Sequence, residues 1–250
     1  MKWIGTSWKM NHNLDTTKKY INALKKNKYI FEKKKINFFI IPPFTSLPLF
    51  LKDKKKLPIA YGAQNMHWEE SGAFTGEISA AMIKSCGCSL VELGHAERFK
   101  YFNEQFSLVN KKIKLALQYK LVPLICIGEK KIEKNFTIRK KLIKNQLDIF
   151  LKNILLKKKD QLILAYEPNW AIGKNKAANI DYCQDSIQFI KEYSQKKLGQ
   201  KSQRVEVLYG GSVNEKNVEE FTNNKFIDGV FMGRSCLKVS NFIKICKRVI

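Results

Sequence analysis

The sequence lacks the marks of several common classes of protein. No apolar run approaches the roughly 18 residues that a membrane-spanning helix needs, and the start, MKWIGTSWKMN, turns polar too early for a signal peptide. Neither a Cys-x-x-Cys pair nor a Gly-x-Gly-x-x-Gly fingerprint occurs, and no stretch has low complexity. These absences predict a cytoplasmic globular protein that has no membrane partner.

Groups that bind metals or form disulfides are also scarce. There are 3 histidines, and the 6 cysteines are scattered without finger-type spacing to any of them. A chain of 250 residues with 44% hydrophobic residues can build a core that needs no disulfide. We therefore expect reduced thiols and no metal site.

Short apolar runs alternate with longer segments of helical period. The runs are residues 3–7, 36–41, 59–63, 89–93, 121–127, 162–166, 205–209 and 227–232. They do not alternate cleanly between polar and apolar residues, which is typical of parallel strands buried on both faces. Eight strand–helix units without a long linker predict one domain over residues 1–250, an α/β protein built as a closed (β/α)8 barrel. An open doubly wound sheet is the competing architecture.

The helical segments carry boundary signals of their own. Residues 15–28 form one candidate helix, with Asn13 or Asp15 as its N-cap. Residues 132–156 form another, with an apolar stripe that runs to Leu155. Asn214 is expected to cap the helix that follows Gly210-Gly211.

Acidic residues are few, 22 against 46 lysines and arginines, which gives a formal net charge of +24. A field of that sign attracts nucleic acid, membrane surfaces and small anions. The lysine runs 33–35, 54–56, 157–159 and 196–197 fall late in helices or just before strands, where they complement helix dipoles. We interpret most of this charge as solvated surface. A nucleic-acid partner remains the minority alternative, because no aromatic platform or RNA-binding motif supports it.

Polar residues follow the strands at the other end of the predicted barrel. Lys9 follows the first strand, His95 the fourth and Glu167 the sixth, and glycine-containing turns follow the seventh and eighth. Each has a structural explanation when taken alone, such as a cap or a tight turn. Because all of them are expected at the same end of the barrel, they instead suggest a catalytic site with a base, an electrophile, a cation and a binding site for an anion.

Six segments identify a resemblance that covers nearly the whole chain. They are SWKMN, GAQNMHWEESGAFTGEISAAM, ELGHAERF, AYEPNWAIGK, LYGGSV and DGVFMGRS. In their order and spacing they resemble the signature segments of the triosephosphate isomerase family. The resemblance implies a TIM barrel that interconverts dihydroxyacetone phosphate and glyceraldehyde 3-phosphate without metal or cofactor.

Roles follow from the resemblance position by position. Glu167 matches the general base, His95 the neutral electrophile and Lys9 the electrostatic stabiliser, an arrangement for which this family is the standard example. Glu97 matches an acid that organises Lys9 and His95. Residues 168–178 match a mobile lid, which is expected to remove water from the base and so raise its basicity.

The resemblance also implies a phosphate site and a second subunit. The phosphate would be bound through backbone N–H groups, which are those of Gly173, Ser212, Gly233 and Arg234. Residues 72–77 resemble a loop that reaches into a partner chain and places Thr75 near the partner's active site. A homodimer is therefore expected.

The chain departs from the family at five positions. Ser7 replaces Asn, Ala96 replaces Ser, Phe99 replaces Arg, and Asn175 and Arg234 each replace Gly. Ser7 would take the substrate-facing position of the Asn, and we expect it to leave a polar gap that water fills, so Ser7→Asn should raise kcat/KM modestly. The Arg234 side chain is expected to point away from the phosphate or to lie at the rim. These departures leave a second function open, that of a weakened barrel which serves as a binding or scaffold protein.

Overall fold

The computed structural model describes residues 1–174, 177–199 and 205–250. Eight parallel strands close into a barrel in chain order, and β1 pairs with both β2 and β8. The strands are β1 (Lys2–Ser7), β2 (Ile36–Ile41), β3 (Ala60–Ala63), β4 (Leu90–Leu93), β5 (Val122–Ile127), β6 (Leu162–Tyr166), β7 (Val205–Gly211) and β8 (Gly229–Met232). The sequence-based prediction of a closed (β/α)8 barrel is confirmed, and the open sheet is excluded.

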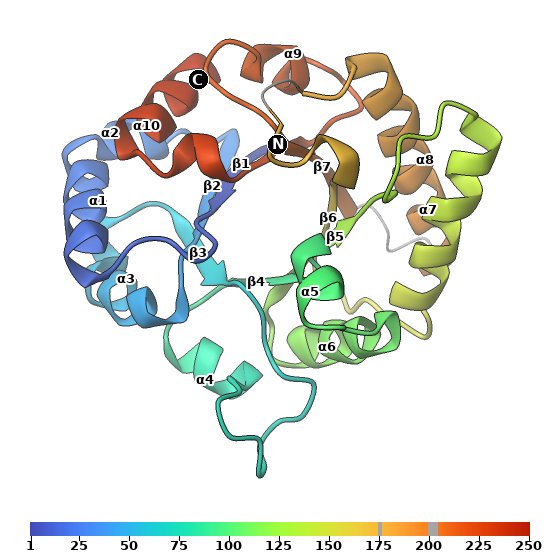
Figure 1. The fold of residues 1–250 in the computed structure, drawn as a ribbon. Helices are drawn as coiled ribbons and strands as arrows, with labels where there is room; N and C mark the ends of the chain where they lie inside the picture. The colour runs from blue at the N-terminus through green and yellow to red at the C-terminus, as the bar shows by residue number, and fades with distance from the viewer. Residues whose placement is uncertain (175–176, 200–204) are drawn as a thin grey trace.

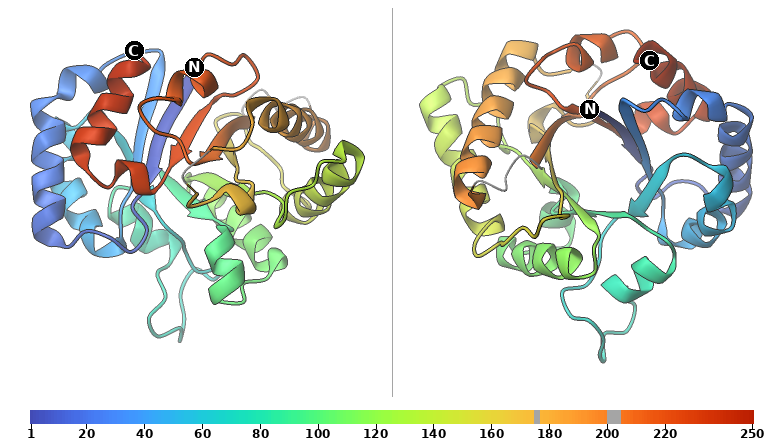
Figure 2. Two further views of the ribbon diagram at one scale, coloured as in Figure 1. Left: turned by 45° about the horizontal axis from the view of Figure 1, so that its top comes forward. Right: turned by 180° about the vertical axis from the view of Figure 1, so that it is seen from behind.

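Helices surround this barrel on all sides (Figure 1), and the tilted and rear views of Figure 2 show the same ring. They are α1 (Leu14–Lys26), α2 (Lys28–Phe31), α3 (Leu47–Asp53), α4 (Ala80–Ser85), α5 (Ala96–Tyr101), α6 (Phe106–Gln118), α7 (Phe136–Phe150), α8 (Ile180–Leu198), α9 (Val218–Thr222) and α10 (Val239–Arg248). Short 3-10 turns lie between them: η1 (Phe44–Ser46), η2 (Lys54–Lys56), η3 (Asn169–Ala171) and η5 (Arg234–Cys236).

Apolar side chains fill two separate regions. Alternate residues of the strands point outward and pack under the helices, as Ile4, Val91 and Leu164 do. The intervening residues point inward and pack with one another, as Trp3, Leu90 and Leu208 do. This two-residue alternation fixes which strand residues can reach the mouth of the barrel from inside.

The observed helices agree with one of the predicted boundary signals and differ from two. Asn13 is the N-cap of α1, and its side chain accepts a hydrogen bond from the Thr16 N–H. The helix predicted over 132–156 is shorter, since α7 ends at Phe150, and Leu155 is 87% exposed rather than part of the apolar stripe. Asn214 does not cap a helix: α9 starts at Val218 after Asn217, and the Asn214 side chain instead accepts from the Lys216 N–H within a turn.

The lysine runs lie where the sequence predicted them. Lys54–Lys56 form η2 ahead of β3, and Lys196 and Lys197 occupy the last turn of α8. Residues 33–35 directly precede β2, and residues 157–159 end three residues before the first residue of β6. All four runs therefore lie toward the end of the barrel at which strands begin.

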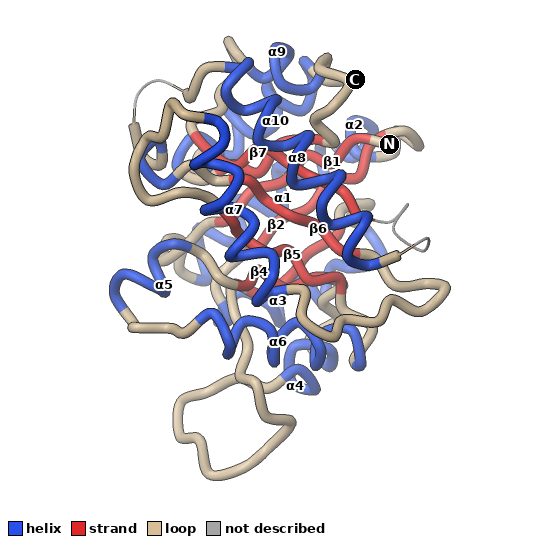
Figure 3. Tube along the Cα trace, turned by 90° about the vertical axis from the view of Figure 1, so that its right-hand side faces the viewer, coloured by secondary structure: helices blue, strands red, loops and turns tan. Residues whose placement is uncertain are grey.

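One loop leaves the barrel. Residues 64–79, between β3 and α4, project beyond the ring of helices (Figures 1 and 3), and Thr75 on this loop is exposed. All six cysteines are free thiols. Among the described residues, no helix has the length and apolar character required to cross a membrane.

Candidate active site

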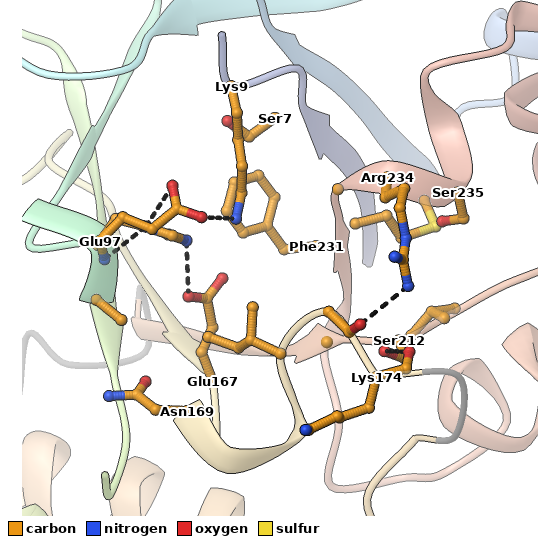
Figure 4. Close-up of a pocket in the computed structure, with 18 of the residues that line it drawn as sticks. Ser7, Lys9, Glu97, Glu167, Asn169, Lys174, Ser212, Phe231, Arg234 and Ser235 are labelled. Atoms are coloured by element: carbon orange, nitrogen blue, oxygen red, sulfur yellow. Dashed lines mark hydrogen bonds and ion pairs between the residues drawn. The ribbon is translucent and has the colours of Figure 1, made fainter. Parts of the chain in front are cut away.

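A cavity of about 960 Å³ opens at the end of the barrel where the strands finish. Residues that follow β1, β4, β6, β7 and β8 line it, and Figure 4 shows many of them. All the predicted catalytic, phosphate-binding and supporting residues are brought together there: Ser7, Lys9, His95, Glu97, Glu167, Gly173, Ser212, Gly233 and Arg234. Thr75 lies outside this cavity, on the projecting loop.

His95 is fixed in orientation by the start of α5. It is the N-cap residue of this helix, and its Nδ1 accepts a hydrogen bond of 3.2 Å from the Glu97 backbone N–H. A ring nitrogen that accepts carries no proton, so in the neutral imidazole the proton is on Nε2. That Nε2 lies 3.5 Å from Glu167 Oε2, and the N–H therefore points into the cavity beside the carboxylate.

Glu167 lies where two glycines leave room for it. A Cβ on Gly210 would lie 2.4 Å from Glu167 Cγ, and one on Gly128 would lie 2.0 Å from the Glu167 carbonyl oxygen. The backbone N–H of Glu167 donates to the Ile127 carbonyl over 2.7 Å and so extends the pairing of β5 with β6. The residue is only 5% exposed, yet its Oε2 accepts no hydrogen bond. Glu167 thus presents a desolvated, unoccupied carboxylate oxygen to the cavity.

Lys9 is held from both its backbone and its side chain. Its φ of 52° is left-handed, an uncommon conformation for a residue with a side chain, and the Gln64 amide donates to its carbonyl over 2.9 Å. Its Nζ forms an ion pair of 2.6 Å with Glu97 Oε1 (Figure 4). Burial lowers the pKa of Lys9, but the bond to Glu97 and the charges of nearby glutamates outweigh it and leave that pKa raised. Burial raises the pKa of Glu97, but the hydrogen bond from Lys9 and the charges of Lys9 and His95 outweigh burial. The pKa of Glu97 is therefore lowered.

The predicted phosphate-binding residues lie at the opposite rim. Gly173 has φ 70°, which favours glycine, and η5 starts at Arg234 directly after Gly233. The Ser212 hydroxyl donates to the Lys174 carbonyl over 2.6 Å. Lysine and arginine side chains at this rim add positive charge near the backbone N–H groups.

The predicted lid is tied to the barrel at several points, although residues 175 and 176, including the departure Asn175, lie outside the described residues. Trp170 donates to Glu129 Oε1 over 2.8 Å, and the Ala178 N–H donates to the Tyr209 hydroxyl over 3.1 Å. Arg234 lies at the rim, as the sequence predicted, but its guanidinium also donates to the Gly173 carbonyl over 3.0 Å (Figure 4). The sequence offered no signal for this contact between the eighth strand's loop and the lid.

Glu92 is a residue of the cavity lining that sequence reasoning missed. This residue of β4 is 3% exposed, and its Oε2 accepts a hydrogen bond of 2.8 Å from the Ser7 hydroxyl. Burial raises the pKa of Glu92 to about 7, the charge of Glu167 adds to the effect, and His95, Ser7 and Lys9 oppose it. The signal that could have found it is an acid within the apolar run SLVEL, two residues after an inward-facing leucine.

The contact with Glu92 changes the interpretation of Ser7. Its hydroxyl has a protein partner, so the polar gap expected from the sequence is not there. A larger amide at position 7 would press on the buried carboxyl, and Ser7→Asn is now expected to lower kcat/KM instead of raising it. Phe99 packs edge-on against Phe106 with 4.8 Å between ring centroids, whereas nothing in the structure explains Ala96.

Comparisons with known proteins agree with this geometry. The family model described as triosephosphate isomerase matches residues 2–249. A triosephosphate isomerase of Alkaliphilus metalliredigens is 40% identical over 97% of both chains, and an L-erythrulose-1-phosphate isomerase of Rhizobium meliloti is 40% identical over 99% of this chain and 96% of its own. A solved triosephosphate isomerase from Bartonella henselae has a TM-score of 0.85 and 29% identity, with 98% of each chain covered. The chain therefore belongs to the triosephosphate isomerase family.

Proposed function

We propose that this protein interconverts dihydroxyacetone phosphate and D-glyceraldehyde 3-phosphate through an enediol(ate) intermediate. The observation that carries the proposal is the free Oε2 of buried Glu167, which faces the cavity 3.5 Å from the Nε2 of His95. A base and a donor side by side suit the transfer of a proton between two neighbouring carbons. Family membership supports the same reaction.

The chemistry follows from the positions of three side chains. Glu167 removes a proton from the carbon next to the carbonyl, and the C–H electron pair becomes the C=C bond of the enediol(ate). The Nε2–H of His95 and the ammonium of Lys9 stabilise the negative charge that grows on the oxygens. Return of the proton to the neighbouring carbon completes the isomerisation. The overall reaction moves protons only, so it consumes no oxidant or reductant.

The phosphate group would bind at the rim. Gly173, Ser212, Gly233 and Arg234 supply its backbone donors in the proposal. The side chains of Ser212 and Arg234 lie across the cavity from Glu97 (Figure 4). Binding there orients the reacting carbons toward Glu167 and leaves the non-reacting end fixed. The lid residues between 168 and 174 then limit the access of water to the carboxylate.

A coupled assay with purified protein and each triose phosphate tests the proposal. Wild-type protein should turn over both, and Glu167→Gln should lose that turnover while it still binds a phosphate-bearing inhibitor such as 2-phosphoglycolate. Weak turnover that Glu167→Gln leaves unchanged would favour the alternative of a binding or scaffold barrel, for which the comparisons give no support.

A second candidate substrate comes from the relatives. Two of them, from Rhizobium meliloti and Rhizobium etli, are named L-erythrulose-1-phosphate isomerase and are 40% and 39% identical. That ketose is dihydroxyacetone phosphate with a hydroxymethyl group in place of one hydrogen on the carbon that loses its proton. The observation that favours it here is the polar wall formed by Ser7 and Glu92.

Further proposals concern the whole chain. Residues 1–250 would act as a single domain in the cytoplasm, with a homodimer as the working form. The projecting loop of residues 64–79 supports the dimer, since its residues 69–77 are exposed and include Thr75 and the 41% exposed Phe74. Thr75 would then lie near the active site of the partner subunit.

A further inference from the structure

Glu92 is an ionisable group that the proposed reaction does not use. It lines the same cavity as Glu167 and His95, and it lies on the inward face of β4, two residues beyond Leu90 of the barrel interior. Ser7 has the corresponding inward position on β1, four residues beyond Trp3. The two side chains therefore meet in the layer of the barrel interior nearest the mouth, directly beside the catalytic groups.

The partners of Glu92 leave part of its carboxyl free. Ser7 donates one hydrogen bond of 2.8 Å to Oε2, and the Cys126 thiol lies 4.0 Å from Oε1, which is at most a weak donor contact. Among residues 1–174, 177–199 and 205–250, none of the ion pairs includes Glu92. An ionised carboxyl accepts about four hydrogen bonds, so Oε1 retains capacity for a donor that enters the cavity.

Packing alone does not account for an acid at this place. Its neighbours on the inward face are apolar, among them Leu90, Leu124 and Phe231. An aliphatic side chain of similar volume would fill the same space without the cost of burying an ionisable group. The remaining acceptor capacity of Oε1, whose one contact is the weak one with the Cys126 thiol, therefore points to a ligand that carries a hydrogen-bond donor.

In the proposed function, the other parts of the cavity lining already contact the substrate. The rim of Gly173, Ser212, Gly233 and Arg234 takes the phosphate, Glu167 faces the reacting carbon, and His95 and Lys9 face the oxygens. Ser7, Glu92 and Phe231, which lie on the inward faces of β1, β4 and β8, are among the other residues that line the cavity. In the proposed function, a substituent on the reacting carbon that points away from the phosphate is directed toward these residues, where it meets the carboxyl of Glu92.

We propose that Glu92, oriented by Ser7, determines substrate specificity by accepting a hydrogen bond from the terminal hydroxyl of a hydroxymethyl group on the reacting carbon. The site then takes four-carbon 2-ketose 1-phosphates as well as the three-carbon substrate. This inference rests on the proposed function, because the same base acts on both. The proton leaves C3 of the ketose for Glu167, the C–H electron pair becomes the enediol(ate) double bond, and return of the proton to C2 leaves the carbonyl at C3.

The test compares two substrates across matched variants. L-erythrulose 1-phosphate and dihydroxyacetone phosphate are assayed with wild type, Glu92→Gln, Glu92→Leu and Ser7→Ala. The control is Glu206→Gln, which alters another inward-facing acid, on β7, that forms a 2.8 Å bond with Gln161 and does not line the cavity. If a larger change at position 92 prevents folding, the isosteric Glu92→Gln and the Ser7→Ala variant still decide the question.

We expect Glu92→Leu to lower kcat/KM for the four-carbon substrate at least tenfold more than for the three-carbon one, mainly through KM. Ser7→Ala should act in the same direction more weakly, and Glu206→Gln should not discriminate between the substrates. Equal losses on both substrates, or no four-carbon turnover by an active wild type, would overturn the inference and leave the proposed function standing. Failure of the proposed function looks different, since wild type would then lack triose phosphate turnover or Glu167→Gln would retain it.

Discussion

The two ends of the barrel use charge in different ways. At the mouth, several charged side chains are oriented individually: Glu92 and Glu167 are buried, and Lys9 forms an ion pair with Glu97. At the opposite end, lysines occur in exposed runs just ahead of strands, as residues 33–35 and 54–56 do. The positive charge of the whole chain therefore says little about function, whereas a few desolvated groups at the mouth account for the chemistry.

Two inward-facing acids, one near each end of the barrel, show the same difference for single residues. Glu92 lies near the mouth and lines the cavity, and Glu206 lies near the start of β7 and is bonded to Gln161. Burial raises the pKa of both carboxyls. Only the one at the mouth lies next to groups that can react, so a raised pKa by itself does not identify a functional residue.

The largest expected effect comes from Glu167→Gln. An amide keeps the shape of the side chain but cannot accept the proton, so kcat should fall by roughly 10²–10⁴, the range for loss of a general base. Affinity for 2-phosphoglycolate should change little, which calorimetry can measure. A fall in kcat of less than about tenfold would remove Glu167 from the role of base. Glu206→Gln, the same chemical change away from the cavity, should leave kcat near that of wild type.

Glu92→Gln should change how stability depends on pH. Because burial raises the pKa of Glu92 from 4.5 to about 7, the folded protein binds a proton that the unfolded chain releases between these pH values. The free energy of unfolding of wild type should therefore fall, relative to that of the variant, as pH rises from 4.5 to 7. The full difference is on the order of 3 kcal/mol for a shift of this size. Urea titrations of both proteins at several pH values measure it, and parallel pH profiles would show that Glu92 is not desolvated as described.

Thr75→Arg tests whether the active site at the mouth of the barrel depends on a partner subunit. A bulky charge on the projecting loop should weaken the proposed dimer by about 1.4 kcal/mol or more, equivalent to tenfold in the dissociation constant. Activity at dilute protein should fall with association, as sedimentation and assay at matched concentrations would show. Thr75→Ser is the matched control. A fully active, undissociated dimer of the arginine variant would exclude residues 72–77 from the interface.

These contrasts also explain what the sequence could predict. Strand positions followed from runs such as residues 162–166, because burial on both faces of a parallel strand demands apolar residues wherever the strand occurs. Glu167 and His95 were found because they stand directly after such runs and within long, specific motifs. Local pattern and position in the barrel agree at these residues.

The misses have a common physical reason. Asn214 has the residue type of a cap, but the chain continues through a turn to Asn217 before α9 starts, so tertiary placement overrides local preference. The Ser7–Glu92 bond joins residues 85 positions apart, and the Arg234–Gly173 contact joins residues 61 apart. Neither pairing has a periodic signal, because it depends on which strand residues point inward and on how far two side chains extend.

Arg234→Gly should have a small effect on the mouth. The guanidinium is exposed and donates one hydrogen bond to the Gly173 carbonyl, so its loss should change KM by no more than about fivefold, equivalent to roughly 1 kcal/mol. Arg234→Lys is the control that retains charge without the planar donor. A large rise in KM that high salt abolishes, and that lysine prevents, would show that the arginine binds the substrate phosphate directly.

The smallest effect is expected at the other end of the barrel. Lys33, Lys34 and Lys35 are exposed, and the triple substitution to glutamine removes three positive charges at the start of β2. Charges much farther from the mouth than the Debye length, about 10 Å at 0.1 M salt, are screened from a substrate there. Values of kcat/KM at 0.1 M salt should therefore stay within about twofold of wild type, and measurements at 0.01 M, where the Debye length is about 30 Å, sharpen the test. A fall of severalfold at low salt that disappears on adding salt would mean that the lysine field steers the anionic substrate toward the mouth, and the two ends of the barrel would then contribute to one function.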